Sequence, residues 1–261
     1  MKLTVVGCSG SFPSPESPAS CYLVEADDAD GRTWRVVLDL GSGALGPLQR
    51  HTRLDAVDAV VISHLHPDHF SDICGLYVAR RYAPAAAATV PSERLPVYGP
   101  TGTADRIRQA YGGDAAGLDD TFDVRPLDPA RPVELGPFTL TPYRVEHPVE
   151  AYGVRVEAHA GPRTEVLAYT GDTDSCDALL PLAKGADLLL AEASYQEGWD
   201  TARGVHLTGL RAGQAAADAG CRRLLLTHVP VWTDPQVVLA EARSAFPGVV
   251  ELARPGGVHL L

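Results

Sequence analysis

The segment SHLHPDH at residues 63–69 places three of the chain's nine histidines and an aspartate within six positions. It follows an apolar, β-branched run with the composition of a buried strand. Side chains two positions apart in an extended stretch project to the same side, so His64 and His66 can face one centre, while Asp68 and His69 fall at the start of the next helix. Imidazole and carboxylate groups together suit Zn, Mn or Fe. The spacing therefore predicts a metal site rather than a chance cluster of histidines.

Three further residues of ligand type, His147, Asp172 and His228, each follow a predicted strand. Taken singly, a histidine or aspartate in such a position is structural at least as often as it is functional. Their shared position at the ends of strands makes them candidate ligands for the same site.

The remaining polar candidates have competing interpretations. Asp39 precedes a Gly-Ser-Gly stretch and is either a turn residue or a carboxylate that orients a ligating imidazole. The SGS loop at residues 9–11 is either an ordinary turn or a source of backbone donors for a phosphate. Three histidines match no pattern, and ordinary surface or core positions are expected for them: His51, His159 and His259.

The composition is that of an ordinary globular protein, with 45% hydrophobic and 21% charged residues among 261. A chain of this length can form one large domain or two small ones. The formal net charge is −11 and no basic run is present, so extended binding of nucleic acid would require a local basic patch that the sequence does not contain. The five cysteines are scattered, which predicts reduced thiols rather than disulfides or a thiolate zinc site.

No apolar run is long enough to span a bilayer, and the first residues, MKLTVVG, have the pattern of a strand rather than of a signal peptide. We therefore expect no membrane association and a cytoplasmic location.

Short β-branched runs recur along the chain and predict strands that are separated by turns in the first half and by helices in the second. The strands are expected at Leu3–Gly7, Cys21–Glu25, Arg35–Asp39, Ala59–Ile62, Phe138–Tyr143, Gly153–Glu157, Val166–Thr170, Leu188–Glu192, Leu224–Thr227 and Gly257–Leu260. Helices are expected at Asp174–Ala183, Thr208–Ala219 and Asp234–Phe246, the last with Asp234 as its N-cap. This pattern predicts sheet layers covered by helices on their outer faces. The alanine- and proline-rich stretch Pro84–Pro96 is expected to be a surface excursion.

Taken in order, SHLHPDH, His147, TGDT at 170–173 and LLLTH at 224–228 resemble the metallo-β-lactamase superfamily, in its ribonuclease Z branch. The stretches GCSGSFPSPESPASCYLV at 7–24, LDLGSG at 38–43, AEAS at 191–194 and VHLTG at 205–209 support this branch. Within it, the short length together with SPAS, LQRH, RRY, YGG and LLLTHVPVWT is similar to the bacterial cyclic-AMP phosphodiesterases described as atypical class II enzymes. The likeness covers essentially the whole chain.

The resemblance implies an α/β fold, the four-layer αβ/βα metallo-β-lactamase sandwich, in which two mixed β-sheets carry helices on their outer faces. Residues 1–261 would form a single hydrolase domain, and the family suggests a homodimer. Two divalent metal ions are implied as cofactors, with Zn expected first and Mn or Fe as alternatives.

The resemblance also assigns roles to individual residues. His64, His66 and His147 would hold one ion, and Asp68, His69 and His228 would hold the other, with Asp172 and a hydroxide bridging them. Two ions about 3.5–4 Å apart can lower the pKa of a shared water and clamp the attacking and leaving oxygens of a displacement at phosphorus.

His206 lies where the ribonuclease Z branch has an extra histidine, and it is the candidate general acid. A departing 3′-alkoxide is a poor leaving group, and proton donation by a positioned imidazole accelerates its departure roughly 10²–10⁴-fold. Glu192 is expected to orient His206. The alternative is a helix-start histidine without a partner. The predicted catalytic residues are Asp68, Glu192 and His206.

These features predict a metal-dependent phosphodiesterase for a small cyclic nucleotide, with 3′,5′-cyclic AMP favoured. The tRNA-trimming enzymes of the branch carry a long arm between the third histidine and the bridging aspartate, whereas only 24 residues separate His147 from Asp172. The alternative is a ribonuclease Z-type tRNA 3′-processing endonuclease, with tRNA ranked below a cyclic nucleotide as the substrate. A metal-binding regulator without catalysis and a thioester or lactone hydrolase rank lower.

Overall fold

The computed structural model describes residues 1–82, 93–113, 117–159 and 163–261. The predicted surface excursion Pro84–Pro96 lies mainly outside these residues, and its last two positions open a strand, β5 (Leu95–Gly99), rather than a loop. Within the described part of the chain, no helix has the length and apolar character needed to cross a membrane.

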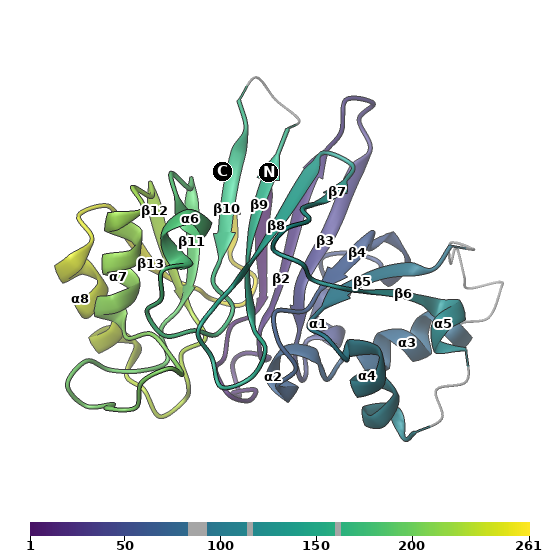
Figure 1. The fold of residues 1–261 in the computed structure, drawn as a ribbon, viewed down its shortest axis with the longest axis horizontal. Helices are drawn as coiled ribbons and strands as arrows, with labels where there is room; N and C mark the ends of the chain where they lie inside the picture. The colour runs from purple at the N-terminus through teal and green to yellow at the C-terminus, as the bar shows by residue number, and fades with distance from the viewer. Residues whose placement is uncertain (83–92, 114–116, 160–162) are drawn as a thin grey trace.

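The described strands form two mixed sheets of seven strands each, which face one another (Figure 1). The first sheet has the order β14-β1-β2-β3-β4-β5-β6, with β14 (Val258–Leu260), β1 (Lys2–Gly7), β2 (Cys21–Asp27), β3 (Thr33–Leu40), β4 (Ala59–Val61), β5 and β6 (Phe122–Pro126). The second has the order β13-β12-β11-β10-β9-β8-β7, with β13 (Val249–Leu252), β12 (Arg223–Thr227), β11 (Leu188–Glu192), β10 (Glu165–Tyr169), β9 (Tyr152–Ala158), β8 (Phe138–Arg144) and β7 (Val133–Leu135).

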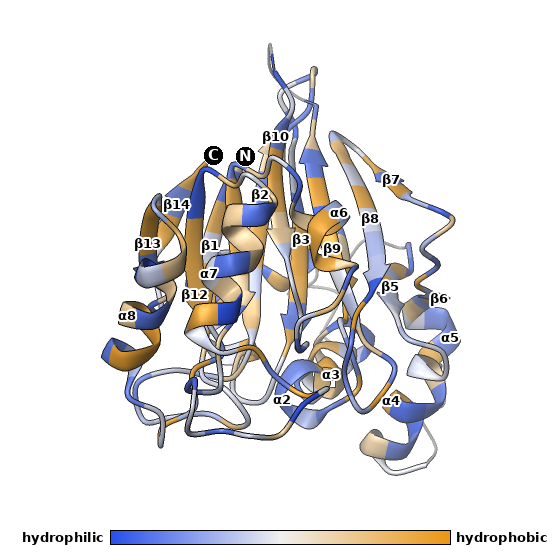
Figure 2. Cartoon of the chain, turned by 60° about the vertical axis from the view of Figure 1, so that its left-hand side comes forward, coloured by the Kyte–Doolittle hydropathy of each residue, from blue (hydrophilic) through white to orange (hydrophobic). Residues whose placement is uncertain are grey.

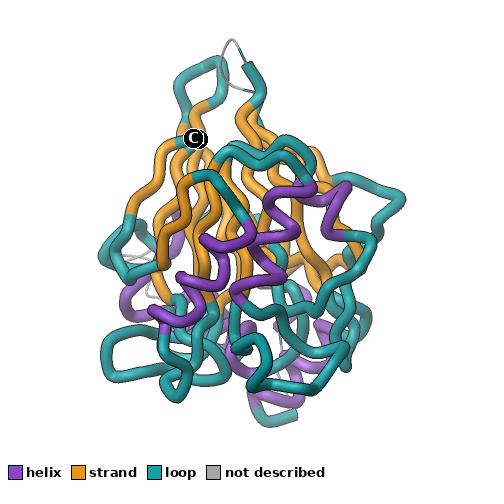
Figure 3. Tube along the Cα trace, turned by 90° about the vertical axis from the view of Figure 1, so that its left-hand side faces the viewer, coloured by secondary structure: helices purple, strands orange, loops and turns teal. Residues whose placement is uncertain are grey.

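Helices cover the outer face of each sheet, which gives the predicted four-layer sandwich (Figures 1 and 3). The first sheet is covered by α1 (Leu45–Leu48), the 3-10 turn η1 (Leu54–Ala56), α2 (Pro67–Phe70), α3 (Ile73–Tyr82), α4 (Thr103–Tyr111) and α5 (Leu118–Thr121). The second is covered by α6 (Leu179–Ala183), α7 (Gly209–Asp218) and α8 (Pro235–Ala245).

The layers arise because the central strands are apolar on both faces. In β11, Leu188 and Leu190 belong to the core between the sheets, whereas Leu189 and Ala191 belong to the core beneath α6, α7 and α8. Successive side chains of a strand point to opposite faces, so an unbroken apolar run is buried on both sides. Figure 2 shows hydrophobic residues concentrated along the strands of both sheets.

All the predicted strands are present, with ends that differ by at most two residues. Strands β5, β6, β7 and β13 were not predicted from the sequence, nor were helices α1, α3, α4 and α5. Three of these strands, β6, β7 and β13, lie at sheet edges, where solvent covers part of the strand and the apolar pattern is weak.

The helix predicted at Asp174–Ala183 is wrong in its first half, because α6 begins only at Leu179. Asp174 instead forms an isolated antiparallel bridge with Glu146, and its carboxylate accepts hydrogen bonds from distant residues. The predicted N-cap of α8 is confirmed, since the Asp234 side chain accepts the N–H of Gln236.

Several strands deliver the chain to the same edge of the sandwich. Strands β10, β11 and β12 run parallel, and β8 runs in their direction because both it and β10 are antiparallel to β9. Together with β4 of the first sheet, they end along the lower edge in Figure 1, where long loops gather. Residues that follow these five strands can therefore meet.

Helices α7 and α8 pack closely because two glycines of α7 face the backbone of α8. A Cβ atom at Gly209 would lie 2.0 Å from the carbonyl oxygen of Val238, and one at Gly213 would lie 2.5 Å from that of Ala242. Backbone atoms of a packed helix cannot move aside cheaply, so side chains are excluded at both positions.

We predict that Gly213→Ala lowers the free energy of unfolding by about 1–3 kcal/mol, the usual effect of overpacking. Alanine gains about 0.5–1 kcal/mol over glycine within a helix, which is too little to offset the clash. Gly46→Ala is the matched control, because a Cβ at Gly46 in α1 meets no atom within 4 Å. Thermal unfolding of both variants measures the difference, and a melting temperature of Gly213→Ala at or above the parent value contradicts the prediction.

Candidate metal centre

The seven predicted metal ligands lie together at the edge of the sandwich, although four separate segments supply them. His64 and His66 follow β4, Asp68 and His69 lie in α2 as predicted, His147 follows β8, Asp172 follows β10 and His228 follows β12. All are buried except His66, which is partly exposed. We call His64, His66 and His147 the histidine set, and Asp68, His69, Asp172 and His228 the mixed set. Within each set, the candidate ligand atoms lie within 4.8 Å of one another.

The histidine set brings three ring nitrogens to one point. His66 Nδ1 lies 3.0 Å from His64 Nε2 and 3.2 Å from His147 Nε2. Burial lowers the pKa of all three imidazoles, which favours the neutral form that binds metal ions. Three nitrogen lone pairs at this range repel one another, and a cation between them would convert that repulsion into coordination.

The mixed set combines two imidazoles with two carboxylates. His69 Nε2 lies 3.1 Å from His228 Nε2. Asp68 Oδ2 lies 3.0 Å from His228 Nε2 and 3.5 Å from His69 Nε2. Asp172 adds Oδ1 at 3.3 Å from His69 Nε2 and Oδ2 at 3.5 Å from His228 Nε2.

Asp172 lies between the two sets, because its Oδ2 is also 3.7 Å from His64 Nε2. Burial by itself raises the pKa of this carboxyl, but the imidazoles of His228 and His69 outweigh burial and hold the pKa well below its usual range. Its Oδ1 is buried and accepts no hydrogen bond from any residue that the structure describes. His69 Nε2 lies 3.3 Å away without forming a hydrogen bond to it, and a metal ion would satisfy an ionised buried oxygen in this position.

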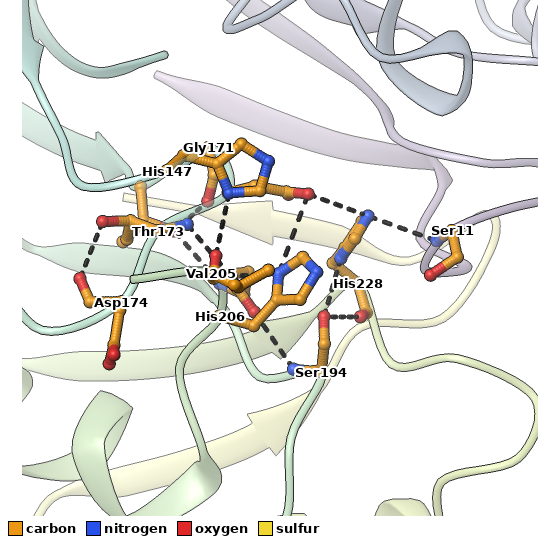
Figure 4. A network of polar contacts seen from close by, with 12 residues as sticks. Ser11, His147, Gly171, Thr173, Asp174, Ser194, Val205, His206 and His228 are labelled. Atoms are coloured by element: carbon orange, nitrogen blue, oxygen red, sulfur yellow. Dashed lines mark hydrogen bonds and ion pairs between the residues drawn. The ribbon is translucent and has the colours of Figure 1, made fainter. Parts of the chain in front are cut away.

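Four of the imidazoles make a polar contact through Nδ1, the ring nitrogen that points away from the centre. The contacts are His64 Nδ1 to Ser63 Oγ at 3.1 Å, His69 Nδ1 to Asp39 Oδ2 at 2.7 Å, His147 Nδ1 to the Val205 carbonyl at 2.8 Å, and His228 Nδ1 to Ser194 Oγ at 2.8 Å. Figure 4 shows Val205 and Ser194 in these positions. Such partners fix the ring orientation and leave Nε2 as the candidate ligand atom.

Asp39 is one of these orienting groups. Of the two interpretations from the sequence, a turn residue or a carboxylate that orients an imidazole, the structure supports the second. It is fully buried at the end of β3, and its Oδ1 accepts the Ser63 N–H at 2.6 Å. Its Oδ2 accepts hydrogen bonds from Ser63 Oγ, His69 Nδ1 and Tyr169 Oη, each at 2.7 Å. Asp39 therefore positions both the ligand-bearing loop and one imidazole.

The centre concentrates buried negative charge. Asp39, Asp68, Asp172 and Glu192 are each at most 7% exposed, and none forms an ion pair with an arginine or lysine in the described residues. Buried carboxylates require compensating positive charge. Imidazole nitrogens and carboxylate oxygens are the donors that Zn, Mn and Fe accept, so these residues fit divalent metal ions.

His206 and Glu192 form a hydrogen-bonded pair beside both sets. His206 Nδ1 lies 2.7 Å from Glu192 Oε1 and 3.9 Å from Asp172 Oδ2. Burial by itself lowers the pKa of His206, but the Glu192 carboxylate outweighs burial and raises the pKa to about 9. Glu192 is itself fixed, because its two oxygens accept the N–H groups of Thr173 and Ser194 at 3.0 Å. The alternative of a histidine without a partner is excluded.

An ion pair that was not predicted from the sequence anchors the loop carrying His206. Arg211 contacts the carboxylate of Asp174 and donates to the backbone carbonyl of His206 at 3.2 Å. Asp174 also accepts the Gly204 N–H at 2.8 Å. No local motif marks this pair, because its members are 37 residues apart.

Three non-glycine residues have positive φ angles in the described part of the chain, and all lie at the centre: Ser11 at 64°, Asp39 at 56° and His228 at 56°. This conformation is uncommon for side-chain-bearing residues and gathers at functional sites. Of the three N–H groups in the loop at residues 9–11, only that of Ser11 faces the centre, at 3.4 Å from His228 Nε2 (Figure 4). Those of Ser9 and Gly10 bond to the carbonyls of Pro18 and Val229.

The three histidines without a motif lie elsewhere. His51 and His159 are exposed, and His259 lies in the edge strand β14. None belongs to a group of candidate metal ligands among the described residues.

Comparison with known proteins identifies related sequences. A model of the beta-lactamase superfamily domain matches residues 34–229. The chain is 45% identical over 259 residues to an uncharacterised protein of Mycobacterium leprae, covering 98% of this chain and 87% of that protein. It is 33% identical over 259 residues to the probable metallo-hydrolase YhfI of Bacillus subtilis, covering 99% of both. Identity to ribonuclease BN of Escherichia coli is 27% over 308 residues, covering 97% of both.

Solved structures share the fold over the whole chain. The crystal structure of YhfI from Bacillus subtilis has a TM-score of 0.85 at 30% identity and covers 99% of this chain and 98% of that one. The short form of human tRNase Z has a TM-score of 0.75 at 22% identity, covering 100% and 99%. Unliganded yeast PDE1 has a TM-score of 0.74 at 13% identity, also covering 100% and 99%.

We predict that Asp39→Asn weakens metal binding about 10- to 100-fold, the usual effect of removing a group that orients a ligand. Asparagine keeps the shape but has only one acceptor oxygen, so it cannot accept from Ser63 and His69 on both sides. Competition with a chromophoric chelator measures the affinity.

Asp187→Asn is the matched control, because Asp187 is 5% exposed and pairs with Arg163 away from the centre. It should lower stability and leave metal affinity unchanged. Equal metal affinity in Asp39→Asn and the parent protein would show that Asp39 does not act on the centre.

Proposed function

This chain belongs to the β-lactamase superfamily as a metallo-hydrolase, and from that membership and the geometry of its centre we propose that it is a phosphodiesterase acting on a small cyclic nucleotide, with 3′,5′-cyclic AMP as the favoured substrate. The observation that carries the proposal is the contact of Asp172 with both ligand sets beside the His206–Glu192 pair. That arrangement would accommodate two adjoining cations and one proton donor, which is what cleavage of a phosphodiester with a poor leaving group requires.

The role proposed for the two ligand sets is to bind the metal ions. His64, His66 and His147 would hold one divalent ion, and Asp68, His69 and His228 the other, with Asp172 shared. When bound, two such ions supply a water of lowered pKa and an electrostatic clamp on the oxygens around phosphorus. Each ion would have three ligands of its own and a share of Asp172, which would leave room for substrate, and no side-chain nucleophile would be needed.

The role proposed for His206 is to donate a proton to the leaving group. Its Nδ1 is held by Glu192 Oε1 at 2.7 Å, which leaves the proton on Nε2 free for transfer to the departing 3′ oxygen. His206 is 14% exposed at its side chain, so substrate can reach it, whereas Glu192 is 1% exposed and acts only through it. Glu192 is therefore a positioning residue.

The size of the segment between the third histidine and Asp172 supports a compact substrate. The 24 residues after His147 hold the antiparallel pair β9–β10, which belongs to the second sheet. The alignment with ribonuclease BN is longer than the whole of this chain, so that enzyme carries insertions relative to this one. Phosphate contacts supply most of the affinity for a long polyanion, and a net charge of −11 opposes them.

The second candidate is a ribonuclease Z-type tRNA 3′-processing endonuclease. The specific observations that favour it are the 27% identity to ribonuclease BN and the fold shared with human tRNase Z. The same residues would serve this reaction, with basic surface supplied by a second copy of the chain. The expected homodimer and cytoplasmic location stay predictions.

A direct comparison of substrates tests the proposal. We expect the metal-loaded protein to hydrolyse cyclic AMP with a higher kcat/KM than it shows for cleavage of a tRNA precursor, because the 24 residues between His147 and Asp172 are too few to form a long arm for tRNA. Metal analysis of the same preparation gives the identity and number of ions. Preferred cleavage of the tRNA precursor would favour the second candidate, and two bound metals without any phosphodiesterase activity would overturn both.

We predict that His206→Ala retains its metal content and lowers kcat for cyclic AMP roughly 10²–10⁴-fold. The effect should be much smaller for a p-nitrophenyl phosphodiester, whose leaving group departs without a proton. Glu192→Gln should show the same selectivity with a smaller loss, since the imidazole remains. Loss of a metal ion from His206→Ala would show that His206 is a ligand instead of a proton donor.

A further inference from the structure

Two exposed aromatic rings lie in contact beside the metal centre and take no part in the chemistry derived above. Phe12 is 42% exposed and Trp232 is 66% exposed, and their ring centroids are 5.3 Å apart at an interplanar angle of 50°. Single exposed apolar side chains are ordinary, but two large rings that touch each other and remain open to solvent form a preformed apolar surface.

Both rings are tied to a predicted metal ligand. Phe12 directly follows Ser11, whose N–H lies 3.4 Å from His228 Nε2. Consecutive Cα atoms are about 3.8 Å apart, so Phe12 stands one residue from an atom that contacts the centre. Trp232 lies in the turn that follows His228, only four positions along the chain. The aromatic pair therefore belongs to the same two chain segments that bring Ser11 and His228 to the centre.

The loops that carry the two rings are joined to each other. Ser9 and Val229 form a parallel bridge, and the Gly10 N–H donates to the Val229 carbonyl at 3.3 Å. A Cβ at Gly10 would lie 2.4 Å from the carbonyl oxygen of His228, so the close approach requires glycine. A rigid platform loses little entropy when a ligand stacks on it.

The turn carrying Trp232 is fixed as well. The Thr233 N–H donates to the Pro230 carbonyl at 3.0 Å, and Thr233 Oγ1 donates to the carbonyl of Ser194 at 3.1 Å. Ser194 in turn holds His228 Nδ1, so the same residue fixes a predicted ligand and the aromatic turn.

We propose that Phe12 and Trp232 form the binding platform for the base of the nucleotide whose phosphate is held at the metal centre. This inference rests on the proposed function and names the residues that would select a nucleotide over other phosphodiesters. The base of a cyclic nucleotide is one ribose away from its phosphorus, so a platform next to His228 suits it. Aromatic surfaces stack with any base, and purines offer the larger face.

Kinetics of single variants test the platform. Trp232→Ala and Phe12→Ala should each raise KM for cyclic AMP, by roughly 5- to 150-fold for the residue that carries most of the stacking, while kcat changes far less. Trp232→Tyr should restore most of the affinity, because a ring remains. The loss of kcat/KM should be much larger for cyclic AMP than for methyl p-nitrophenyl phosphate, which has no base.

Trp199→Ala is the matched control, because Trp199 is 81% exposed and lies in a different loop. It should leave KM for cyclic AMP unchanged. A rise in KM as large as that of Trp232→Ala would indicate a general effect of removing surface tryptophan and would overturn the platform.

Binding without turnover separates this inference from the proposed function. In a Trp199→Phe background, adenosine 5′-monophosphate should quench the tryptophan fluorescence, ribose 5-phosphate should not, and Trp232→Phe should abolish the quenching. If cyclic AMP is hydrolysed with a parent KM by both alanine variants, the platform is wrong and the proposed function stands. If the parent protein does not hydrolyse cyclic AMP but the quenching persists, the proposed function falls and the platform stands.

Discussion

The structure depends on the burial of several carboxylates at one point, where no lysine or arginine among the described residues balances them. Asp39, Asp68, Asp172 and Glu192 are all at most 7% exposed, and imidazoles are their only ion-pair partners in the described residues. Buried negative charge of this density is unfavourable unless cations share the space. The arrangement is therefore intelligible as a site for metal ions, and metal binding would be coupled to the stability of the surrounding loops.

The carboxylates and imidazoles meet because strands of both sheets end at one edge of the sandwich. Parallel strands β10, β11 and β12 carry Asp172, Glu192 and His228 to that edge, and β4 of the facing sheet brings His64. The loops then approach one another more closely than side chains would allow. A Cβ at Gly41 would lie 1.9 Å from the carbonyl oxygen of Asp68, so a glycine is needed where the loop after β3 passes α2. Positive φ angles at Asp39 and His228 complete the turn of the chain into the centre.

The residues around the predicted ligands differ in solvent exposure according to the role proposed for them. Groups that orient the predicted ligands, such as Asp39 and Ser194, are fully or almost fully buried and make several hydrogen bonds each. His206 is 14% exposed at its side chain and keeps one nitrogen free, while Phe12 and Trp232 are largely open to solvent. Rigid inner groups and accessible outer ones are what a site needs when it must hold ions firmly and exchange a substrate.

The sequence by itself determined the fold class, most of the interior strands and the candidate ligands, because these depend on local patterns: short β-branched apolar runs, and histidines and aspartates placed just after strands. It could not determine the edge strands β6, β7 and β13, whose apolar pattern is diluted by solvent exposure, nor the start of α6, where Asp174 bonds to Gly204 instead of opening a helix. Only the tertiary structure decided that Asp39 orients His69, that Arg211 anchors the loop of His206, and that Phe12 meets Trp232. The paired residues are 5 to 220 positions apart in the sequence. Residues far apart in the sequence are brought into contact by tertiary packing, which no local sequence pattern can predict.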